Sequence, residues 1–486
     1  MSSAQTPARI DSWVAERLGV VLETGSSPVG LELSDLVGVA VRQNPRRAHL
    51  LVSTVLGKHI PVDPRLVHGA GLLLGLLVRR VLESVTDPVP ASWPQAARAA
   101  LDGHPEALLN VIDTEELPVL DVLVVGFAET ATGLGHSVAD ALRAPYYLHS
   151  TRREVPGVTP TGTFEEGHSH ASTHLLSPLP GEVLSGDLPM ILVDDEFSTG
   201  RTLMATISAL QQQFPRSGYV VAALVDLRSA EADEELRTFA RELGVTIEVV
   251  SLVSGRVHLP AGILTDAADL MQSLPVVGSV PGAVPAGPGS SAPISRVQID
   301  WPADVPDGGR HGFLGSDRAG FRAGVDRIVA ALAPELSSYQ RVLLLGTEEF
   351  MYLPHMVGVR LTETTGLDVR YQTTTRSPVF PVDDPGYPVR RRVAFVDPEG
   401  DTVVDRYLNN ALWLDGAGLD FTEADVVVVL VDGPADTDLL YGPRGLVTVV
   451  ASWGVPVVLA AVTGADPVRT GLQRSTERGS VDDGSA

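Results

Sequence analysis

The chain has 486 residues, of which 44% are hydrophobic and 20% charged, which is a globular composition and excludes a disordered or fibrous protein. With 60 acidic against 36 basic residues, the formal net charge of −24 disfavours general binding to nucleic-acid backbones. The absence of cysteine excludes disulfides, cysteine-ligated zinc, iron–sulfur clusters and cysteine nucleophiles.

The amino-terminal segment predicts neither secretion nor membrane insertion. Residues 1–25 lack the basic and apolar stretches of a signal peptide, and we expect them to form a flexible leader. The longest apolar run, near residues 69–78, is too short to cross a bilayer. We therefore expect no membrane partner and a cytoplasmic location.

Helices and strands are predicted to alternate through the first half of the chain. Residues 65–84 have the apolar spacing of a mostly buried helix. Continuous apolar strands are predicted at 120–127, 145–150, 189–196, 219–227 and 246–253. Such strands, separated by helices, indicate a parallel sheet that is covered on both faces. We therefore expect residues 26–273 to form an α/β domain with a Rossmann-like sheet.

A second alternating region follows a stretch that favours a linker. Residues 274–295 are rich in proline, glycine and alanine and carry no charge, so a linker is predicted at 274–296. Further strands are predicted at 341–349, 367–375, 391–397, 424–432, 446–451 and 455–462. The sequence therefore predicts a second parallel α/β domain at 297–465 and a flexible tail at 466–486.

The two halves share a pattern of strand ends. One strand ends at Gly126 and the next at residues 150–153, while the second half has Gly346 and residues 374–377 in the same order. A later apolar strand ends in aspartate in each half, at Asp194 and Asp432. We expect the second domain to be a diverged copy of the first, the alternative being chance agreement between two generic α/β halves.

The most informative motif is the stretch 190–202, in which a buried strand delivers Asp194 and Asp195 to a Ser-Thr-Gly-Arg-Thr loop before a helix. Backbone N–H groups of such a loop and the helix amino terminus bind an anion, and Gly200 permits close approach. The two carboxylates can accept hydrogen bonds from hydroxyls. A ribose 5-phosphate meets both demands. A receiver-like strand end also carries an aspartate pair, but it does not continue into this loop.

This motif resembles the fingerprint of the type I phosphoribosyltransferases: four apolar residues, two acidic residues, a spacer, then Thr/Ser-Thr/Ser-Gly-x-Thr/Ser. The resemblance implies a type I fold that binds phosphoribosyl diphosphate. Asp194 and Asp195 would hold the ribose, and the 5-phosphate would lie on Ser198, Thr199, Gly200, Arg201 and Thr202. In that family an earlier loop holds the diphosphate, and this place is occupied by Phe127, Ala128, Glu129 and Thr130. Glu129 is unusual there unless it holds magnesium-bound water or the nucleophile.

The long polar stretch 150–176 is predicted to be a lid. Arg152 and Arg153 are expected to face phosphates, and an acidic and histidine cluster follows them, consisting of Glu165, Glu166, His168, His170 and His174. In the family that the motif resembles, a mobile loop after the second core strand closes over the leaving diphosphate. A zinc or manganese site around His168 and His170 is one alternative, and a solvated polar loop is another.

Over residues 30–465 the chain resembles one subgroup, phosphoribosyltransferase-like proteins with a carboxyl-terminal domain named after a Thr-Arg-Ser-Pro (TRSP) motif. The similar segments are 52–61, 150–153, 164–172, 346–354 and 375–378. The resemblance implies an origin in bacterial tellurium-resistance and stress gene clusters, and it leaves the acceptor open. Lys58, the only lysine, lies in the first of these segments. It is a candidate cation for the diphosphate, the alternative being a surface lysine in a turn.

A second group of candidate residues lies at predicted strand ends of the second domain. It consists of Glu348, Glu349, Thr375, Arg376 and Ser377. An arginine beside hydroxyls suits a phosphate or a carboxylate, whereas a satisfied structural corner is the competing interpretation. The corner at Asp432 lacks the Ser-Thr-Gly-x-Thr loop, so a second complete phosphoribosyl site is not expected.

The predicted reaction is transfer of the 5-phosphoribosyl group from phosphoribosyl diphosphate to a nitrogenous base or related acceptor, with release of diphosphate. Mg²⁺ is expected to arrive with the diphosphate. The predicted catalytic residues are Asp194, Asp195, Arg152, Arg153, Glu165 and His168. The alternative is a non-catalytic sensor that binds phosphoribosyl diphosphate or a nucleotide. The partners expected are small molecules, and a homodimer is an option that the sequence leaves open.

Overall fold

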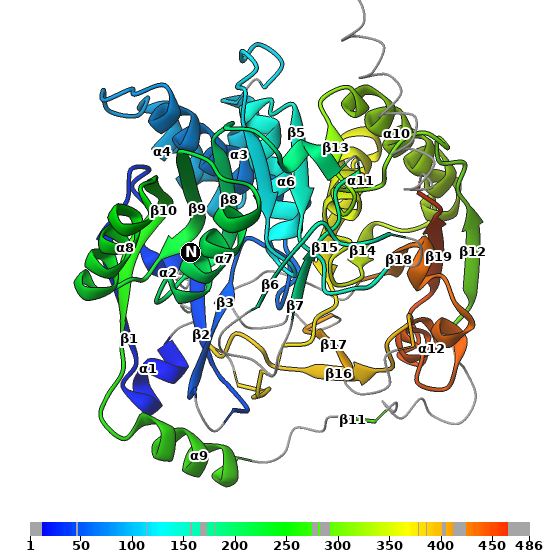
Figure 1. Ribbon diagram of the computed structural model, residues 1–486. Helices are drawn as coiled ribbons and strands as arrows, with labels where there is room; N and C mark the ends of the chain where they lie inside the picture. The colour runs from blue at the N-terminus through cyan, green and yellow to red at the C-terminus, as the bar shows by residue number, and fades with distance from the viewer. Residues whose placement is uncertain are drawn as a thin grey trace, which may run out of the picture.

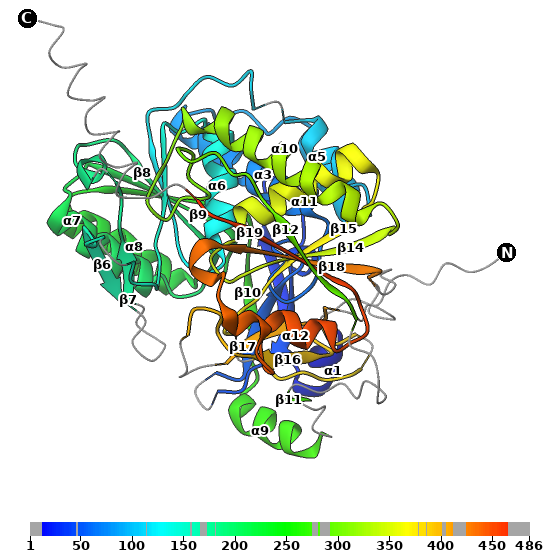
Figure 2. The ribbon, with the colours of Figure 1, turned by 90° about the vertical axis from the view of Figure 1, so that its right-hand side faces the viewer.

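The computed structural model describes residues 12–44, 47–112, 114–155, 158–165, 173–179, 181–274, 280–281, 292–377, 379–384, 386–400, 405–411 and 424–464. These residues form two large sheets with helices on both faces of each (Figures 1 and 2). The parallel α/β class predicted for both halves is confirmed.

The first sheet has seven strands in the order β1-β10-β9-β8-β4-β5-β13. Its five central strands are parallel, and the edge strands β1 and β13 run antiparallel to their neighbours. The central strands are mostly buried, as continuous apolar runs predict. The bounds of all seven strands are β1 (Val21–Ser26), β4 (Leu123–Gly126), β5 (Tyr146–His149), β8 (Met190–Phe197), β9 (Gly218–Asp226), β10 (Thr246–His258) and β13 (Phe313–Leu314).

Helices α3 (Pro64–Leu82) and α6 (Ala131–Leu142) cover one face of this sheet. Helices α7 (Arg201–Gln213) and α8 (Ala230–Leu243) cover the other. Helix α3 begins where expected because Asp63 accepts a hydrogen bond from the Arg65 N–H and Pro64 takes the first helical position. Within the described ranges, no helix combines the length and the hydropathy that a membrane span requires.

The second sheet contains five parallel strands in the order β12-β19-β18-β14-β15. Four consecutive parallel strands of each half have the same spatial order, β5-β4-β8-β9 in one and β15-β14-β18-β19 in the other. A diverged copy would share this order. The bounds are β12 (Ile294–Gln298), β14 (Arg341–Gly346), β15 (Asp368–Thr373), β18 (Val426–Asp432), β19 (Val457–Val462), α10 (Asp317–Leu336), α11 (Tyr352–Thr365) and α12 (Leu446–Ala451).

The two sheets are joined through shared packing. Helix α11 packs against α3 and α6, and one hydrophobic core includes Leu72, Leu134 and Leu353. The ring of His136 on α6 stacks on Tyr352 of α11 with 3.5 Å between centroids. Strand β13, which belongs to the predicted second domain, also pairs with β5 of the first sheet. The two halves are therefore not structurally independent domains joined only by a linker. The domain boundaries drawn from composition stay a prediction.

Smaller elements surround the two sheets. A hairpin of β2 (Val37–Val41) and β3 (His49–Ser53) lies below the first sheet in Figure 1, and β16 and β17 lie below the second. The remaining bounds are α1 (Ser12–Leu18), α2 (Leu33–Leu36), α4 (Ser92–Leu101), α5 (Glu106–Asn110), β6 (Gly162–Glu165), β7 (Thr173–Leu176), η1 (Gly181–Leu184), α9 (Ile263–Ser273), β11 (Val280–Pro281), β16 (Arg392–Phe395), β17 (Arg406–Asn409), η2 (Gly433–Ala435) and η3 (Asp438–Tyr441).

Two expectations about local structure were wrong. Residues 446–451, predicted as a strand, form helix α12, in which all residues except Thr448 are buried. Packing on the sheet therefore overrides the strand preference of its valines. Residues 12–25, predicted as part of a flexible leader, contain helix α1 and most of strand β1, because Trp13 and Val14 enter a core with Tyr387.

Candidate functional site

Strand β8 carries three consecutive carboxylates out of the core at its carboxyl end. Met190 through Val193 are buried, whereas Asp194, Asp195 and Glu196 are partly exposed. The Asp195 N–H donates to Asp194 Oδ1 at 2.9 Å. Burial and the neighbouring Asp195 carboxylate raise the pKa of Glu196 to about 7. Negative charge is therefore concentrated here, where hydroxyl donors or a cation would stabilise it.

The loop after β8 leads directly into helix α7. Ser198 and Thr199 are exposed, and Gly200 has φ 71°, a left-handed conformation that favours glycine. The N-cap position of α7 is Gly200, which has no side chain, and the Arg201 N–H donates to Thr199 Oγ1 at 3.4 Å. The first N–H groups of this 13-residue helix, together with its dipole, therefore face the loop as an anion-binding end.

The loop after β4 lies beside β8. The Phe127 N–H donates to Val193 O at 2.9 Å, and the Ala128 N–H donates to Ser150 Oγ at the same distance. A Cβ on Gly126 would lie 2.4 Å from Ala131 O, so only glycine allows α6 to start this close to the strand. The predicted diphosphate loop, Phe127 to Thr130, is thus buried next to the predicted ribose-binding carboxylates.

Lys58 is brought to the same loop by the second domain. Its Nζ donates to Thr130 Oγ1 at 2.7 Å. The turn that carries it is held by strand β15, because the Thr373 N–H donates to Gly57 O at 2.8 Å. Burial raises the pKa of Glu129, and the charge of Lys58 opposes this shift in Glu129 as it does in Glu196. The only lysine of the chain therefore lies at the β4 loop, and its charge also acts on the end of β8.

The raised pKa of Glu196 leads to a prediction. Its ordinary value of 4.5 applies to the unfolded chain, so the folded protein binds the extra proton and loses stability as the pH rises from 4.5 through 7. Glu196→Gln removes this loss. In chemical denaturation, the free energy of unfolding of the variant relative to the wild type should increase by on the order of 2 kcal/mol from pH 4 to pH 8.

Glu242→Gln, on the exposed face of α8, is the control for loss of a carboxylate. A stability difference between Glu196→Gln and the wild type that stays constant over this pH range would contradict the prediction.

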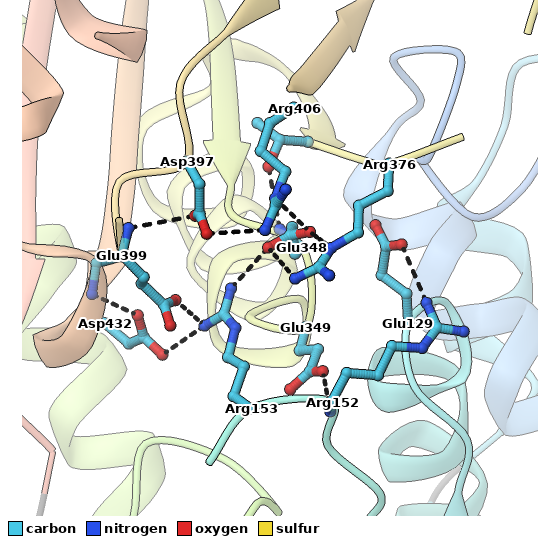
Figure 3. A network of polar contacts seen from close by, with 12 residues as sticks. Glu129, Arg152, Arg153, Glu348, Glu349, Arg376, Asp397, Glu399, Arg406 and Asp432 are labelled. Atoms are coloured by element: carbon cyan, nitrogen blue, oxygen red, sulfur yellow. Dashed lines mark hydrogen bonds and ion pairs between the residues drawn. The ribbon is translucent and has the colours of Figure 1, made fainter. Parts of the chain in front are cut away.

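The predicted candidates of the second domain meet the first domain in a buried ionic network (Figure 3). Glu348 contacts three guanidinium groups: Arg153 at 3.0 Å, Arg376 at 2.5 Å and Arg406 at 2.9 Å. Burial alone would raise the pKa of Glu348, but Arg153 and Arg376 outweigh it and lower this pKa to about 2. Glu348 is therefore an ionised carboxylate that pairs with arginines of both domains.

The Arg153 side chain was expected to face phosphates, but it points toward carboxylates of the second domain. Its side chain is 9% exposed and contacts Glu399 and Asp432 in addition to Glu348. All three carboxylates belong to the second domain, so Arg153 joins the two halves.

Glu349 holds the beginning of the predicted lid. Thr151 Oγ1 donates to Glu349 Oε2 at 2.6 Å, and the Arg152 N–H donates to Oε1 at 2.8 Å. The Arg152 side chain extends back toward the diphosphate loop, where its Nη1 lies 3.9 Å from Glu129 Oε2 (Figure 3). Arg152 thus stays with the first site, while its backbone is fixed by the second domain.

The remaining residues of the Thr-Arg-Ser-Pro motif form a corner. Thr375 and Ser377 are buried, and the Ser377 N–H donates to Thr375 Oγ1 at 3.1 Å. Thr375 also pairs with Tyr407 through its backbone. Pro378 lies outside the described residues. Of this motif, only Arg376 presents a partly exposed charged group.

Part of the predicted lid is an antiparallel hairpin of β6 and β7. His174 is buried, stacks on Phe164 with 4.7 Å between ring centroids and lies with Nδ1 2.9 Å from Ser150 Oγ. The side chain of Glu165 and all of Glu166, His168 and His170 lie outside the described residues. In the described part of the chain, no three His, Cys, Asp or Glu residues are grouped to hold a metal.

Several charged residues of the network were not predicted from the sequence. Arg406 contacts Asp397 at 2.8 Å, and Arg310 contacts Asp432 at 3.0 Å. These residues stand singly at the ends of short elements or in loops, so no spacing pattern marks them. Position at the end of a predicted strand, as for Asp397 and Asp432, is the signal that could have found two of them.

Two cavities of the described structure lie away from the end of β8. One, of about 20 Å³, holds at most one water beside Glu349 and Arg310. The other, of about 430 Å³, lies among helices α3, α10 and α11, and none of the predicted site residues lines it. Neither of these two cavities includes the end of β8.

Comparison with known proteins places both halves. A family model described as phosphoribosyl transferase matches residues 36–256, and a model described as the TRSP domain carboxyl-terminal to that transferase matches residues 307–450. No curated protein matches the chain.

Among solved structures, the chain is similar to adenine phosphoribosyltransferase from Trypanosoma brucei in complex with AMP, pyrophosphate and ribose-5-phosphate. The identity is 18%, the TM-score is 0.24, and the match covers 32% of this chain and 68% of that one. The adenine enzyme from Rhodothermus marinus has 20% identity, a TM-score of 0.22 and coverage of 30% and 80%. Orotate phosphoribosyltransferase from Aeropyrum pernix has 20% identity, a TM-score of 0.17 and coverage of 28% and 60%.

Proposed function

Because this chain belongs to the family in which a phosphoribosyl transferase domain precedes a TRSP domain, we propose that it transfers the 5-phosphoribosyl group of phosphoribosyl diphosphate to a nitrogenous base or related acceptor. The observation that carries the proposal is the end of β8. There Asp194 and Asp195 are followed by a short loop that leads into the amino terminus of α7, with Gly200 at the N-cap position. Carboxylates that can accept hydrogen bonds from sugar hydroxyls, next to a helix amino terminus that can bind an anion, suit a ribose 5-phosphate.

In the proposed reaction, the bond between the anomeric carbon and the diphosphate oxygen breaks, and its electron pair leaves with the diphosphate. The ring carbon becomes cationic, as in glycoside hydrolysis. The acceptor nitrogen then forms the new bond to this carbon and loses its proton. Asp194 and Asp195 accept hydrogen bonds from the ribose hydroxyls and favour the positive charge on the ring.

The residues around the β4 loop would hold the leaving diphosphate. Lys58 and Arg152 supply positive charge beside Thr130 and Glu129. We keep Arg152 for this role and leave Arg153 out, because the latter is engaged by three carboxylates. The predicted acceptor base, Glu165 or His168, remains a prediction.

Magnesium would enter with the diphosphate. This ion keeps several waters and needs few protein ligands, and the carboxylates at the end of β8 are of the kind that it prefers. Within the described residues no three carboxylate or histidine side chains are grouped to hold a metal, so the diphosphate and water would supply most of the ligands. When bound, the ion would neutralise charge on the diphosphate.

Turnover tests the proposal. The protein is incubated with Mg²⁺, phosphoribosyl diphosphate and each nucleobase in turn, and diphosphate and nucleotide are quantified together. We expect one acceptor to give equal amounts of both products, above a control without base. Binding of phosphoribosyl diphosphate without nucleotide formation across all acceptors would replace the transferase with the non-catalytic sensor.

A further inference from the structure

We propose that the diphosphate subsite is built by both domains, with Arg376 of the carboxyl-terminal domain contributing a guanidinium to the diphosphate. The inference rests on the proposed function, because it names a further residue of the same site. The sequence pattern had instead placed Arg376 in a separate site of the second domain.

The backbone brings Arg376 to the first domain in a defined way. Strand β15 ends at Thr373, and the Thr374 N–H donates to Gly346 O at 3.2 Å. The same strand end fixes the Lys58 turn through the bond from Thr373 to Gly57. One strand therefore positions both Lys58 and Arg376 over the β4 loop.

Three cations from separate segments then surround Glu129. Lys58 reaches Thr130, the neighbour of Glu129, and Arg152 lies 3.9 Å from the Glu129 carboxylate. Figure 3 shows Arg376 beside Glu129, and each of the two charges acts on the pKa of the other. Lys58, Arg152 and Arg376 thus bring three positive charges to the neighbourhood of Glu129, and Arg376 also pairs with the carboxylate of Glu348. A diphosphate bound at the β4 loop would therefore meet cations from both domains.

Exposure distinguishes Arg376 from the other guanidinium groups on Glu348. The side chain of Arg406 is fully buried and that of Arg153 is 9% exposed, whereas that of Arg376 is 31% exposed. Among these three, Arg376 is thus the one that a ligand can reach. The Arg376 Nε donates a hydrogen bond to Glu348, and this bond fixes the orientation of the Arg376 guanidinium. An oriented guanidinium suits phosphate oxygens, because it can donate two parallel hydrogen bonds.

The test compares three ligands by titration calorimetry with Mg²⁺ present: phosphoribosyl diphosphate, inorganic diphosphate and ribose 5-phosphate. Arg376→Ala is expected to lower the affinities for phosphoribosyl diphosphate and for inorganic diphosphate about tenfold or more, and to leave the affinity for ribose 5-phosphate unchanged. Arg376→Lys should recover part of the loss, because it restores the charge without the fork. Arg444→Ala is the matched control, since this arginine pairs with Asp405 at the surface of the same domain and its side chain is 47% exposed.

Should Arg376→Ala fail to fold, Arg376→Gln replaces it, because glutamine still donates to Glu348 but carries no charge. Unchanged affinity for inorganic diphosphate, or equal weakening of all three ligands, would overturn the composite subsite. Failure of the wild type to bind either phosphoribosyl diphosphate or ribose 5-phosphate would instead overturn the proposed function, so the two failures are distinguishable.

Discussion

Replacing Asp194 and Asp195 together by asparagine is expected to lower the affinity for phosphoribosyl diphosphate by at least about 100-fold. Hydrogen bonds to a charged group contribute about 1.5–3 kcal/mol each, and two of them would be weakened. The fold should persist, because both side chains are partly exposed and asparagine has the same shape. Titration calorimetry measures the affinity, and circular dichroism checks the fold.

The chain offers a matched control for this variant. Asp383 and Asp384 are also adjacent, and they lie in the second domain outside the candidate site. The double asparagine variant at these positions should bind phosphoribosyl diphosphate as the wild type does. An Asp194→Asn/Asp195→Asn protein that binds within about threefold of the wild type would rule out a ribose subsite at the end of β8.

Glu348→Gln is expected to destabilise the protein by about 3–5 kcal/mol at pH 7. The carboxylate is buried and contacts Arg153, Arg376 and Arg406, so a neutral amide leaves three guanidinium groups without their shared counter-ion. Urea denaturation gives the free energy of unfolding. The exposed pair Arg296–Asp436 provides the control, since Asp436→Asn should cost less than about 1 kcal/mol.

The same variant has a defined pH dependence. The pKa of Glu348 is about 2 in the folded protein against an ordinary value of 4.5, so its ionised form stabilises the fold above pH 4.5. This contribution is lost as the pH falls from 4.5 through 2, and the gap between wild type and Glu348→Gln should close over that range. A gap that is small at pH 7, or that is unchanged at pH 3, would mean that Glu348 does not hold the domains together.

The parts of the molecule that depend on local sequence were predictable. The end of β8 could be derived from thirteen consecutive residues, because a buried strand, two carboxylates and a glycine-containing turn into a helix are all local features. The central strands followed from uninterrupted apolar runs. Helix α12 did not, because its valine-rich stretch adopts a helix only where it packs on the second sheet.

The contact between the domains was beyond the reach of sequence patterns. Glu348 and Arg153 are 195 positions apart, and neither position carries a periodic signal that ties it to the other. Lys58 was a candidate because it is the sole lysine and lies in a segment that resembles the subgroup, but its place over the β4 loop depends on strand β15. Composition likewise suggested two domains joined by a linker, whereas β13 and helix α11 bind the halves through one core.

A structure of the protein in complex with phosphoribosyl diphosphate and Mg²⁺ tests the central claim most directly. The account predicts the 5-phosphate on the N–H groups of residues 198–202, the ribose hydroxyls on Asp194 and Asp195, and the diphosphate beside Thr130 within reach of Lys58 and Arg376. A ligand bound elsewhere, for instance in the cavity among α3, α10 and α11, with the end of β8 empty, would contradict it.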